Sequence, residues 1–414
     1  MIIKNPDRHQ MIVDKISNMR TFGLIIAAVL ISTNLSAQND KFEFNGYLKN
    51  LQTGIYPEDH TLMQNELITD NLLHNRLNFA YYPDAKWSLV LQGRNRFMYG
   101  EMVKLMNSFT ATTGESYAEM LSQDNGFFDL SESILSDNGY ILHTMVDRMY
   151  VDFVSGQWQV RAGRQRLNWG VSMVWNPNDI FNTFNYFDFD YEERPGTDAL
   201  KVQYYTGAAS SAELVWQAGK NWDEMALGAL YRFNKFGFDW QVLGGYMRDD
   251  AVFGAGWSGN IGGAGFRGEA TWFQHKGNFA DTAGQIVASV SADYMFDNSL
   301  YLSTGLLFNN QGTTGKAARP LLFINNQDLS AKTLTPSKTE LFFQISYPFT
   351  PLLSADFSAI VNPFDGSWYS GPALTYSLAQ NIDAMLSSQL FFGDKGTEYG
   401  DVGQLFYLRI KWSF

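Results

Sequence analysis

The sequence contains no cysteine, and it holds only 11 prolines and five histidines among its 414 residues. Without cysteine there is no disulfide framework, no thiolate metal site, no cysteine nucleophile and no lipid attached to an N-terminal cysteine. Charged residues make up only 17% of the chain, and acidic residues outnumber basic ones, so the formal net charge is −12. Such a chain repels the phosphate backbone of nucleic acids, and we expect no nucleic-acid partner.

Long hydrophobic runs are also absent, apart from one near the N-terminus. Arg20 is followed by the apolar stretch 21–32, and the small residues Ser36 and Ala37 come shortly after it. A basic start, a short apolar segment and a small-residue cleavage site are typical of a signal peptide, and the run is too short for a transmembrane helix. The sequence predicts a signal peptide over residues 1–37, starting from Met1 or Met19, and one exported domain over residues 38–414.

Aromatic residues and glycine are abundant, with 32 Phe, 21 Tyr, 11 Trp and 36 Gly. Across the exported domain apolar and polar residues alternate, which is the pattern of β-strands with two different faces. These segments are roughly ten residues or longer, as a tilted strand across a bilayer requires, whereas soluble strands average five or six. We predict an all-β fold, a transmembrane antiparallel barrel, because only a closed sheet satisfies every backbone group in lipid.

The alternating segments indicate about 18 strands, with 16 as the alternative because residues 251–259 are rich in glycine. Short links follow the even-numbered strands and long links follow odd-numbered ones, as expected for periplasmic turns and outer loops. The predicted strands are 41–50, 70–82, 86–99, 143–154, 158–169, 198–206, 211–220, 224–233, 237–247, 251–259, 263–275, 284–296, 299–310, 338–348, 352–362, 368–379, 382–393 and 403–414.

These features together resemble the Gram-negative outer-membrane porins over nearly all of the exported domain. A shorter stretch, Gly163-Arg164-Gln165-Arg166 and the residues up to Phe181, is similar to porin-like proteins of the alginate-export type, but it implies no substrate. The resemblance implies a bacterial outer-membrane location, in contact with lipid and lipopolysaccharide. It also implies that the barrel-assembly machinery reads the last strand, and we assign that role to Ile410, Trp412 and Phe414.

A two-residue turn at Gly156-Gln157 sets the register of one hairpin. It places Phe153 opposite Val160 on the outer face and Asp152 opposite Arg161 on the inner face. Strict alternation puts Asp147 on the outer face, and Arg164 too unless a bulge after Gly163 turns it inward. Elsewhere the same parity predicts a basic pore wall of Lys49, Arg76, Arg94, Arg96, Arg148, Arg161, Arg409 and Lys411. It also predicts an acidic wall of Glu213, Asp239, Glu269, Asp293, Asp356 and Asp383.

Opposed charged walls would orient polar solutes, and a ring of arginine favours anions. The alternative is that the charges face water without selectivity. The aromatic loop over residues 170–197 is predicted either to constrict the lumen or to pack over the barrel mouth. Its candidate residues are Trp175, Asn176, Asp179 and Tyr186, and packing is favoured over sugar binding. The carboxylates of the acidic loop 100–142 are expected to be solvated, with divalent-cation binding as the alternative.

Signals for catalysis are lacking. The chain has no GxSxG, no phosphate-binding loop and no Cys/His metal spacing, and its histidines lie in no serine–carboxylate cluster. We therefore expect no enzyme activity, no cofactor and no metal. The function indicated is a passive, water-filled channel for small polar or anionic solutes. The alternative is a barrel that serves as a binding or assembly partner, with its pore closed by the aromatic loop; the solute and the oligomeric state stay open.

Overall fold

The computed structural model describes residues 41–58, 67–110, 114–124, 126–183, 185–188, 196–279, 283–318 and 329–414. The predicted signal peptide and His60 lie outside these ranges. Among the described residues, no helix combines the length and apolar character needed to cross a membrane.

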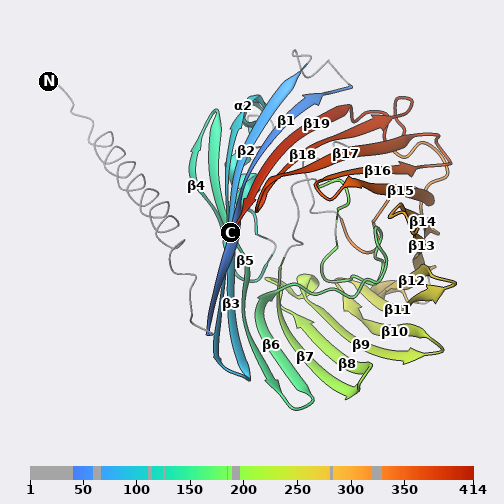
Figure 1. The fold of residues 1–414 in the computed structure, drawn as a ribbon. Helices are drawn as coiled ribbons and strands as arrows, with labels where there is room; N and C mark the ends of the chain where they lie inside the picture. Colours follow the sequence, from blue (N-terminus) through green and yellow to red (C-terminus); the bar gives the residue numbers. More distant parts are fainter. Residues whose placement is uncertain are drawn as a thin grey trace.

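The described chain forms a single antiparallel sheet that curls into a closed ring (Figure 1). The sheet has 19 strands, of which β4 lies beside the ring and the others build the predicted 18-strand barrel. The elements are β1 (Phe42–Tyr56), β2 (Ile68–Asp84), β3 (Trp87–Gly100), α2 (Glu101–Ser108), α4 (Tyr117–Ser122), β4 (Ser131–Asp137), β5 (Tyr140–Ser155), β6 (Trp158–Gln165), β7 (Thr197–Gly207), β8 (Ser210–Gln217), η1 (Trp222–Glu224), β9 (Ala226–Lys235), β10 (Phe238–Met247), β11 (Asp250–Ile261), β12 (Ala264–His275), η2 (Lys276–Asn278), β13 (Gln285–Met295), β14 (Tyr301–Asn309), β15 (Thr339–Thr350), β16 (Leu353–Val361), β17 (Trp368–Ala379), β18 (Ile382–Phe392) and β19 (Gln404–Ser413).

The first and last strands close the ring. β1 pairs with β19 from Tyr47 opposite Ser413 to Tyr56 opposite Gln404. Gly46 and Phe414 extend this seam, because each backbone N–H donates to the other's carbonyl at 3.0 Å. The barrel therefore leaves no open edge along these two strands, which is the condition for a sheet surrounded by lipid.

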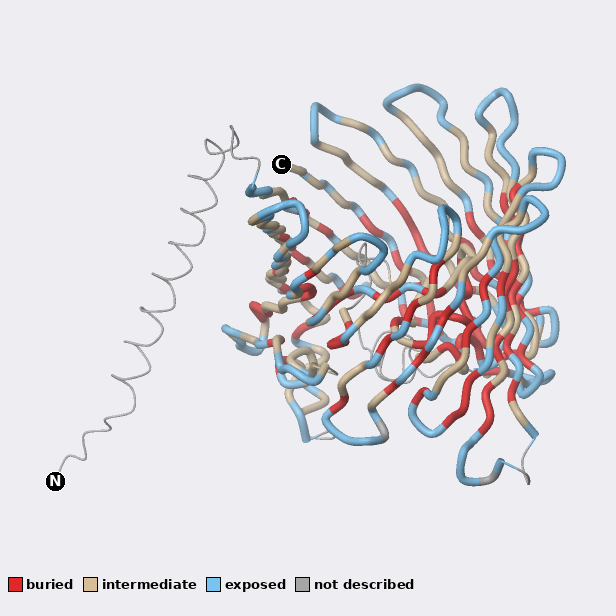
Figure 2. Tube along the Cα trace, turned by 90° about the horizontal axis from the view of Figure 1, so that it is seen from below, coloured by how far each residue is buried: buried red, intermediate tan, exposed pale blue. Residues whose placement is uncertain are grey.

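The two faces of the ring differ as the alternation predicts. On β19 the side chains of Phe406, Leu408 and Ile410 are exposed, whereas Leu405 and Tyr407, which point to the other face, are buried. Buried residues gather in the middle of the strands, and the turns at the strand ends are exposed (Figure 2). Such a continuous band of exposed apolar side chains needs an apolar surrounding, as a bilayer provides.

The glycine-rich segment that left the strand count open is a complete strand, β11, paired with both β10 and β12. Its inner-facing Gly254 and Gly256 leave room for Asn178, which comes from the loop after β6. A Cβ atom on Gly254 would lie 2.6 Å from the Asn178 side-chain oxygen, and one on Gly256 would lie 3.0 Å from its nitrogen. The glycines that weaken the strand signal therefore make space for this loop.

The predicted register of the β5–β6 hairpin is confirmed, with Phe153 opposite Val160 and Asp152 opposite Arg161. Gly163 has a φ of 118° and Arg164 behind it is buried at 3% exposure, but both residues stay in continuous register with β5 and β7, so no bulge follows Gly163. Arg164 is buried because Asp124 and Asp198 bind its guanidinium. Strict alternation fails at one place nearby. The outward prediction for Asp147 is wrong, because the β3–β5 register shifts between Gln92 and Gly93 and the Asp147 side chain is buried.

β4 extends the wall beside β5. The half of β5 that starts at Tyr140 pairs with β4 along one edge, and the half that ends at Ser155 pairs with β6 along the same edge. β6 stops at Gln165, earlier than the predicted residue 169, because the chain leaves the wall there. The next segment, residues 166–183 and 185–188, is called the lumen loop below.

Candidate functional site

The lumen loop runs inside the barrel. Its residues contact inner-facing side chains of strands from β8 to β18, and such a spread is reachable only from within the ring (Figure 1). At one end the Trp169 indole N–H donates to Glu213 at 2.5 Å. At the other end the Phe187 carbonyl accepts a hydrogen bond from Gln389 at 3.0 Å, and its ring packs on Tyr369. Of the two predicted placements, the one inside the lumen is therefore observed.

Several side chains of the wall bind the loop's peptide groups. Side-chain donors bond to loop carbonyls, and a wall carboxylate accepts from loop N–H groups, so these buried polar groups are satisfied. The contacts are Gln241 to the Trp169 carbonyl at 2.6 Å, Ser289 to the Trp175 carbonyl at 2.9 Å, Val171 N–H to Glu269 at 2.7 Å, and Asn178 N–H to Glu269 at 3.4 Å.

The predicted constriction residues lie in this loop and are buried against the wall. Trp175 is 6% exposed, and its ring meets Phe342 edge to face at 6.3 Å. Tyr186 packs on Phe342 and on Tyr369, while Asn176 and Asp179 are 6% and 1% exposed. Their side chains therefore pack between the lumen loop and the inner face of the barrel wall, a contact surface called the loop seat below. This agrees with the packing alternative and leaves no aromatic face of Trp175 open to a sugar.

The six predicted acidic residues are spread over different surroundings. The lumen loop covers Glu213 and Glu269, and Asp293 forms an ion pair with Arg267 at 2.6 Å. Asp239 is exposed beside the β9–β10 turn, and its carboxylate accepts from Asn234 at 2.8 Å. Asp356 is partly exposed, and Asp383, also partly exposed, lies opposite Lys411 across the β18–β19 pair. The loop thus separates part of the acidic wall from the lumen.

The predicted basic residues lie on the opposite side of the ring, in strands β1 to β6 and β19. Directly paired residues point to the same face of a sheet, so they form rows across neighbouring strands about 4.8 Å apart. The longest row is named the basic row: Lys411, Lys49, His74, Arg96 and His143. Along the strands on either side of it lie Arg76, Arg94, Arg148 and Arg409, and Arg161 follows on β6.

Aspartates neutralise part of this cationic surface. The bulge carboxylate of Asp147 contacts the Arg76 guanidinium and lies 3.2 Å from the Arg94 Nε. Asp152 pairs with Arg161 at 2.9 Å, and the Arg161 guanidinium also lies over the Tyr150 ring at 4.4 Å. Lys49 and Lys411 both approach the Tyr47 ring, at 5.5 and 4.6 Å. Lys411, Arg96 and Arg409 stay partly exposed on this side.

Sequence reasoning missed a second cluster, at Arg164. Its guanidinium donates to Asp198 at 2.9 Å, to Asp124 at 2.6 Å and to the Phe128 carbonyl at 2.6 Å. Arg164 therefore ties the loop between β3 and β5 to the barrel just before the lumen loop begins. The stretch Gly163-Arg164-Gln165-Arg166 was noted in the sequence, but the partners of Arg164 lie in distant segments. The alternation of residues along a strand does not predict such contacts.

Carboxylates of the acidic loop between β3 and β5 also serve as internal acceptors. Glu101 accepts from the Thr69 backbone N–H at 3.0 Å and from its hydroxyl at 3.1 Å. Glu119 and Ser116 form a capping box at the start of α4. Within the described ranges, no group of three or more acidic or histidine side chains could hold a metal ion. The divalent-cation alternative gains no support there.

We expect the β3–β5 loop to loosen in acid through Asp124. Burial raises the pKa of Asp124, but the bonds from Arg164, Gly126 and Leu130 outweigh it and hold this pKa below the ordinary value. A lowered pKa in the folded state stabilises the loop above the ordinary aspartate pKa of about 3.9, and this contribution is lost as pH falls through the lowered value. Hydrogen-exchange protection factors of the Gly126 and Leu130 amides should therefore drop in strong acid.

The variant Asp124→Asn should show low protection already at neutral pH, because the amide cannot accept at both oxygen positions. Asp137→Asn, at the exposed β4–β5 turn, is the control and should leave the two amides protected. Equal protection of the Asp124→Asn variant and the parent would contradict the assignment.

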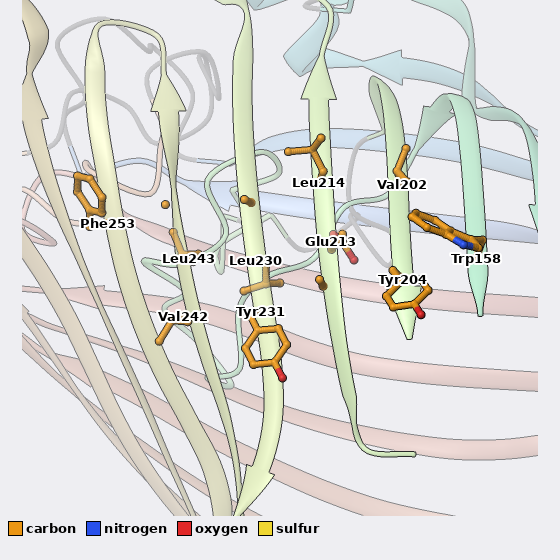
Figure 3. A pocket seen from close by; sticks show the side chains of 13 residues that line it. Trp158, Val202, Tyr204, Glu213, Leu214, Leu230, Tyr231, Val242, Leu243 and Phe253 are labelled. Atoms are coloured by element: carbon orange, nitrogen blue, oxygen red, sulfur yellow. The ribbon is translucent and has the colours of Figure 1, made fainter. Parts of the chain in front are cut away.

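A hollow of about 680 Å³ lies on the other side of the sheet, over β6 to β11. Figure 3 shows Trp158, Leu214, Tyr231 and Phe253 around it, and these side chains are among the exposed hydrophobic residues. The hollow therefore belongs to the apolar outer surface and not to the charged lumen.

Comparison with solved structures finds the same fold. OccAB4 from Acinetobacter baumannii has a TM-score of 0.56 at 10% identity, covering 91% of this chain and 99% of that one. The outer membrane protein OprD from Pseudomonas aeruginosa has a TM-score of 0.55 at 8% identity, covering 90% and 93%. OpdK from Pseudomonas aeruginosa with vanillate has 0.54 at 11%, covering 91% and 98%. No protein-family model and no curated protein sequence matches the chain.

Proposed function

We propose that the chain forms a passive, water-filled channel in the bacterial outer membrane for small polar or anionic solutes. The observation that carries the proposal is the division of one closed barrel into an apolar outer face and an inner face with a cationic side. Water and hydrated ions lower the cost of such inner charges, whereas lipid could not. The lumen loop narrows the ring from the opposite side, so that a solute would pass beside the partly exposed members of the basic row, Arg96 and Lys411.

The similar structures support the location and the solute class. OprD is described as an outer membrane protein, and the OpdK crystal structure contains vanillate, a small aromatic carboxylate. A cationic wall attracts carboxylates by the same electrostatics, which act within about 8 Å at physiological ionic strength. Export through the signal peptide over residues 1–37 is part of the proposal. It would give an outer-membrane protein beginning at or near Gln38, and N-terminal sequencing that finds Met1 or Met19 retained would contradict it.

The direct test of the channel is conductance across a planar lipid bilayer. Purified folded protein should insert in discrete current steps, with the anion permeability above the cation permeability. Folding and insertion are measured separately, by heat-modifiable migration in gels. A folded, inserted barrel that passes no current would instead favour the alternative function, a binding or assembly partner closed by the lumen loop.

We also propose that the barrel is not an enzyme. Within the part of the chain that the structure describes, the Ser131 hydroxyl lies 2.8 Å from the His143 Nε2. The His143 ring is fully buried, and its Nδ1 lies 3.3 Å from the Arg96 guanidinium, not beside a carboxylate. A catalytic histidine needs access to substrate and a partner that stabilises its charged form. Esterase or peptidase activity that is lost in His143→Ala would overturn this part of the proposal.

A further inference from the structure

One carboxylate of the wall contacts both ends of a short segment of the lumen loop. Glu269 on β12 is 1% exposed. Its Oε2 accepts from the Val171 backbone N–H at 2.7 Å, and its Oε1 accepts from the Asn178 backbone N–H at 3.4 Å. The residues between these two contacts, 172–177, are called the loop tip. Glu269 therefore closes the base of the tip with its two oxygens.

The tip reaches over three further strands. The Ser172 hydroxyl lies 2.9 Å from the Ser289 hydroxyl on β13, and the Met173 sulfur lies 3.3 Å from the Tyr301 hydroxyl on β14. The Trp175 ring meets Phe342 on β15. Each of these contacts joins one residue of the tip to one strand, so none replaces the pair of bonds at the base.

We propose that Glu269 is the positioning residue that sets where the loop tip lies in the lumen, and thereby the width of the conducting path. The inference rests on the proposed channel function for its effect on conductance, but the placement of the tip can be measured without any current. A carboxylate is suited to this role because both of its oxygens accept hydrogen bonds, whereas an amide offers one acceptor and one donor. Removing it leaves two buried N–H groups without their acceptor, which favours displacement of the tip.

Two neighbouring wall residues also bind the loop, at Asn178. Asn178 donates from its side chain to the Ala255 carbonyl at 3.1 Å and accepts from the Thr271 hydroxyl at 2.6 Å. These bonds hold Asn178 on the wall, but they do not reach Val171 at the other end of the tip. Inside the loop, Asp179 also accepts from the Trp169 backbone N–H at 3.3 Å, which closes the loop on itself but does not fix it to the wall. Glu269 fixes both Val171 and Asn178 to one wall side chain, so its loss should free the tip more than the loss of Thr271.

Disulfide formation tests the position of the tip. The chain has no cysteine, so Ser172→Cys with Ser289→Cys gives one isolated pair at positions whose hydroxyls lie 2.9 Å apart. With Glu269 present, mild oxidation should close the disulfide rapidly. With Glu269→Ala added, the rate should fall about tenfold, the factor expected for the loss of roughly 1.4 kcal/mol of buried hydrogen bonding. Glu269→Gln keeps one acceptor and should lie between them.

The matched control is Glu43→Gln, which changes charge equally on β1, where Glu43 contacts Asn45 and Tyr82 and not the loop. Its disulfide rate should equal that of the parent pair. Should Glu269→Ala not give a heat-modifiable barrel, the comparison is made with Glu269→Gln. Equal disulfide rates with and without the Glu269 carboxylate would overturn the proposal.

Conductance then separates the two hypotheses. Glu269→Ala with reduced cysteines should conduct more and fluctuate more than the parent, and oxidation should restore the parent conductance by tying the tip back to β13. A slower disulfide in a barrel that never conducts would support the positioning role and contradict the channel function. A slower disulfide with unchanged conductance would contradict the claim that the tip sets the width.

Discussion

Replacing Arg94, Arg96 and Arg148 together by glutamine should make the channel less selective for anions. These arginines lie on β3 and β5, across the lumen from the loop seat. In dilute salt we expect the ratio of cation to anion permeability to rise about threefold, the Boltzmann factor for a local potential of roughly one kT. At 1 M salt the screening length falls to about 3 Å, and the shift should shrink. Reversal potentials measured across a salt gradient give both values.

A second variant should change the ion selectivity in the opposite direction. Asp147 neutralises Arg76 and Arg94 from the bulge in β5, so Asp147→Asn should raise the anion preference. Its amide still accepts a hydrogen bond, which limits the loss of packing. Unchanged reversal potentials in dilute salt for both variants would show that these charges do not act on the permeating ion.

Replacing Phe414 by aspartate should abolish most of the folded, membrane-inserted protein. The Phe414 ring packs against Phe44 at 5.9 Å and Trp412 at 5.1 Å, beside the seam where β19 meets β1. Losing these aromatic contacts and placing a charge on the outer face costs about 2 kcal/mol. The predicted loss of recognition by the assembly machinery adds to this. The fraction of heat-modifiable protein in outer-membrane preparations measures the result.

Ser413→Asp is the matched control for this position. Ser413 lies opposite Tyr47 on the inner side of the same seam, near Lys49 and Lys411, so the same charge is tolerated there. We expect nearly parental yield from Ser413→Asp and from Phe414→Tyr. Parental yield from Phe414→Asp would mean that Phe414 contributes neither to the seam nor to an assembly signal.

The strands were predictable because lipid on one face and polar surroundings on the other impose alternation on each of them. That regularity ends where the backbone leaves the ideal pleat. Asp147 lies at a bulge of β5, so strict alternation placed it on the wrong face. Arg164 is buried without a register shift in β6, because partners from distant segments bind its guanidinium. The glycines of β11 weakened the strand signal for a reason that lies in another segment, since they accommodate Asn178.

The contacts that hold the lumen loop against the wall could not be predicted from the sequence either. The loop's aromatic composition suggested that it does not float in water, but its partners lie far along the chain. Gln389 and Phe187, for example, are 202 residues apart. Periodicity identifies the inner face of each strand, but it does not say which of those side chains meets a loop from across the ring.

Several wall side chains bind peptide groups of the lumen loop, so this part of the contact does not depend on which side chains the loop carries. Gln241, Ser289 and Gln389 contact carbonyls that every residue type carries. Divergence among descendants of this barrel should therefore fall on loop side chains that point away from the seat, such as the exposed Arg166 and Asn168. The same two positions are the natural ones for a designer who wants to change what the pore admits without rebuilding the scaffold.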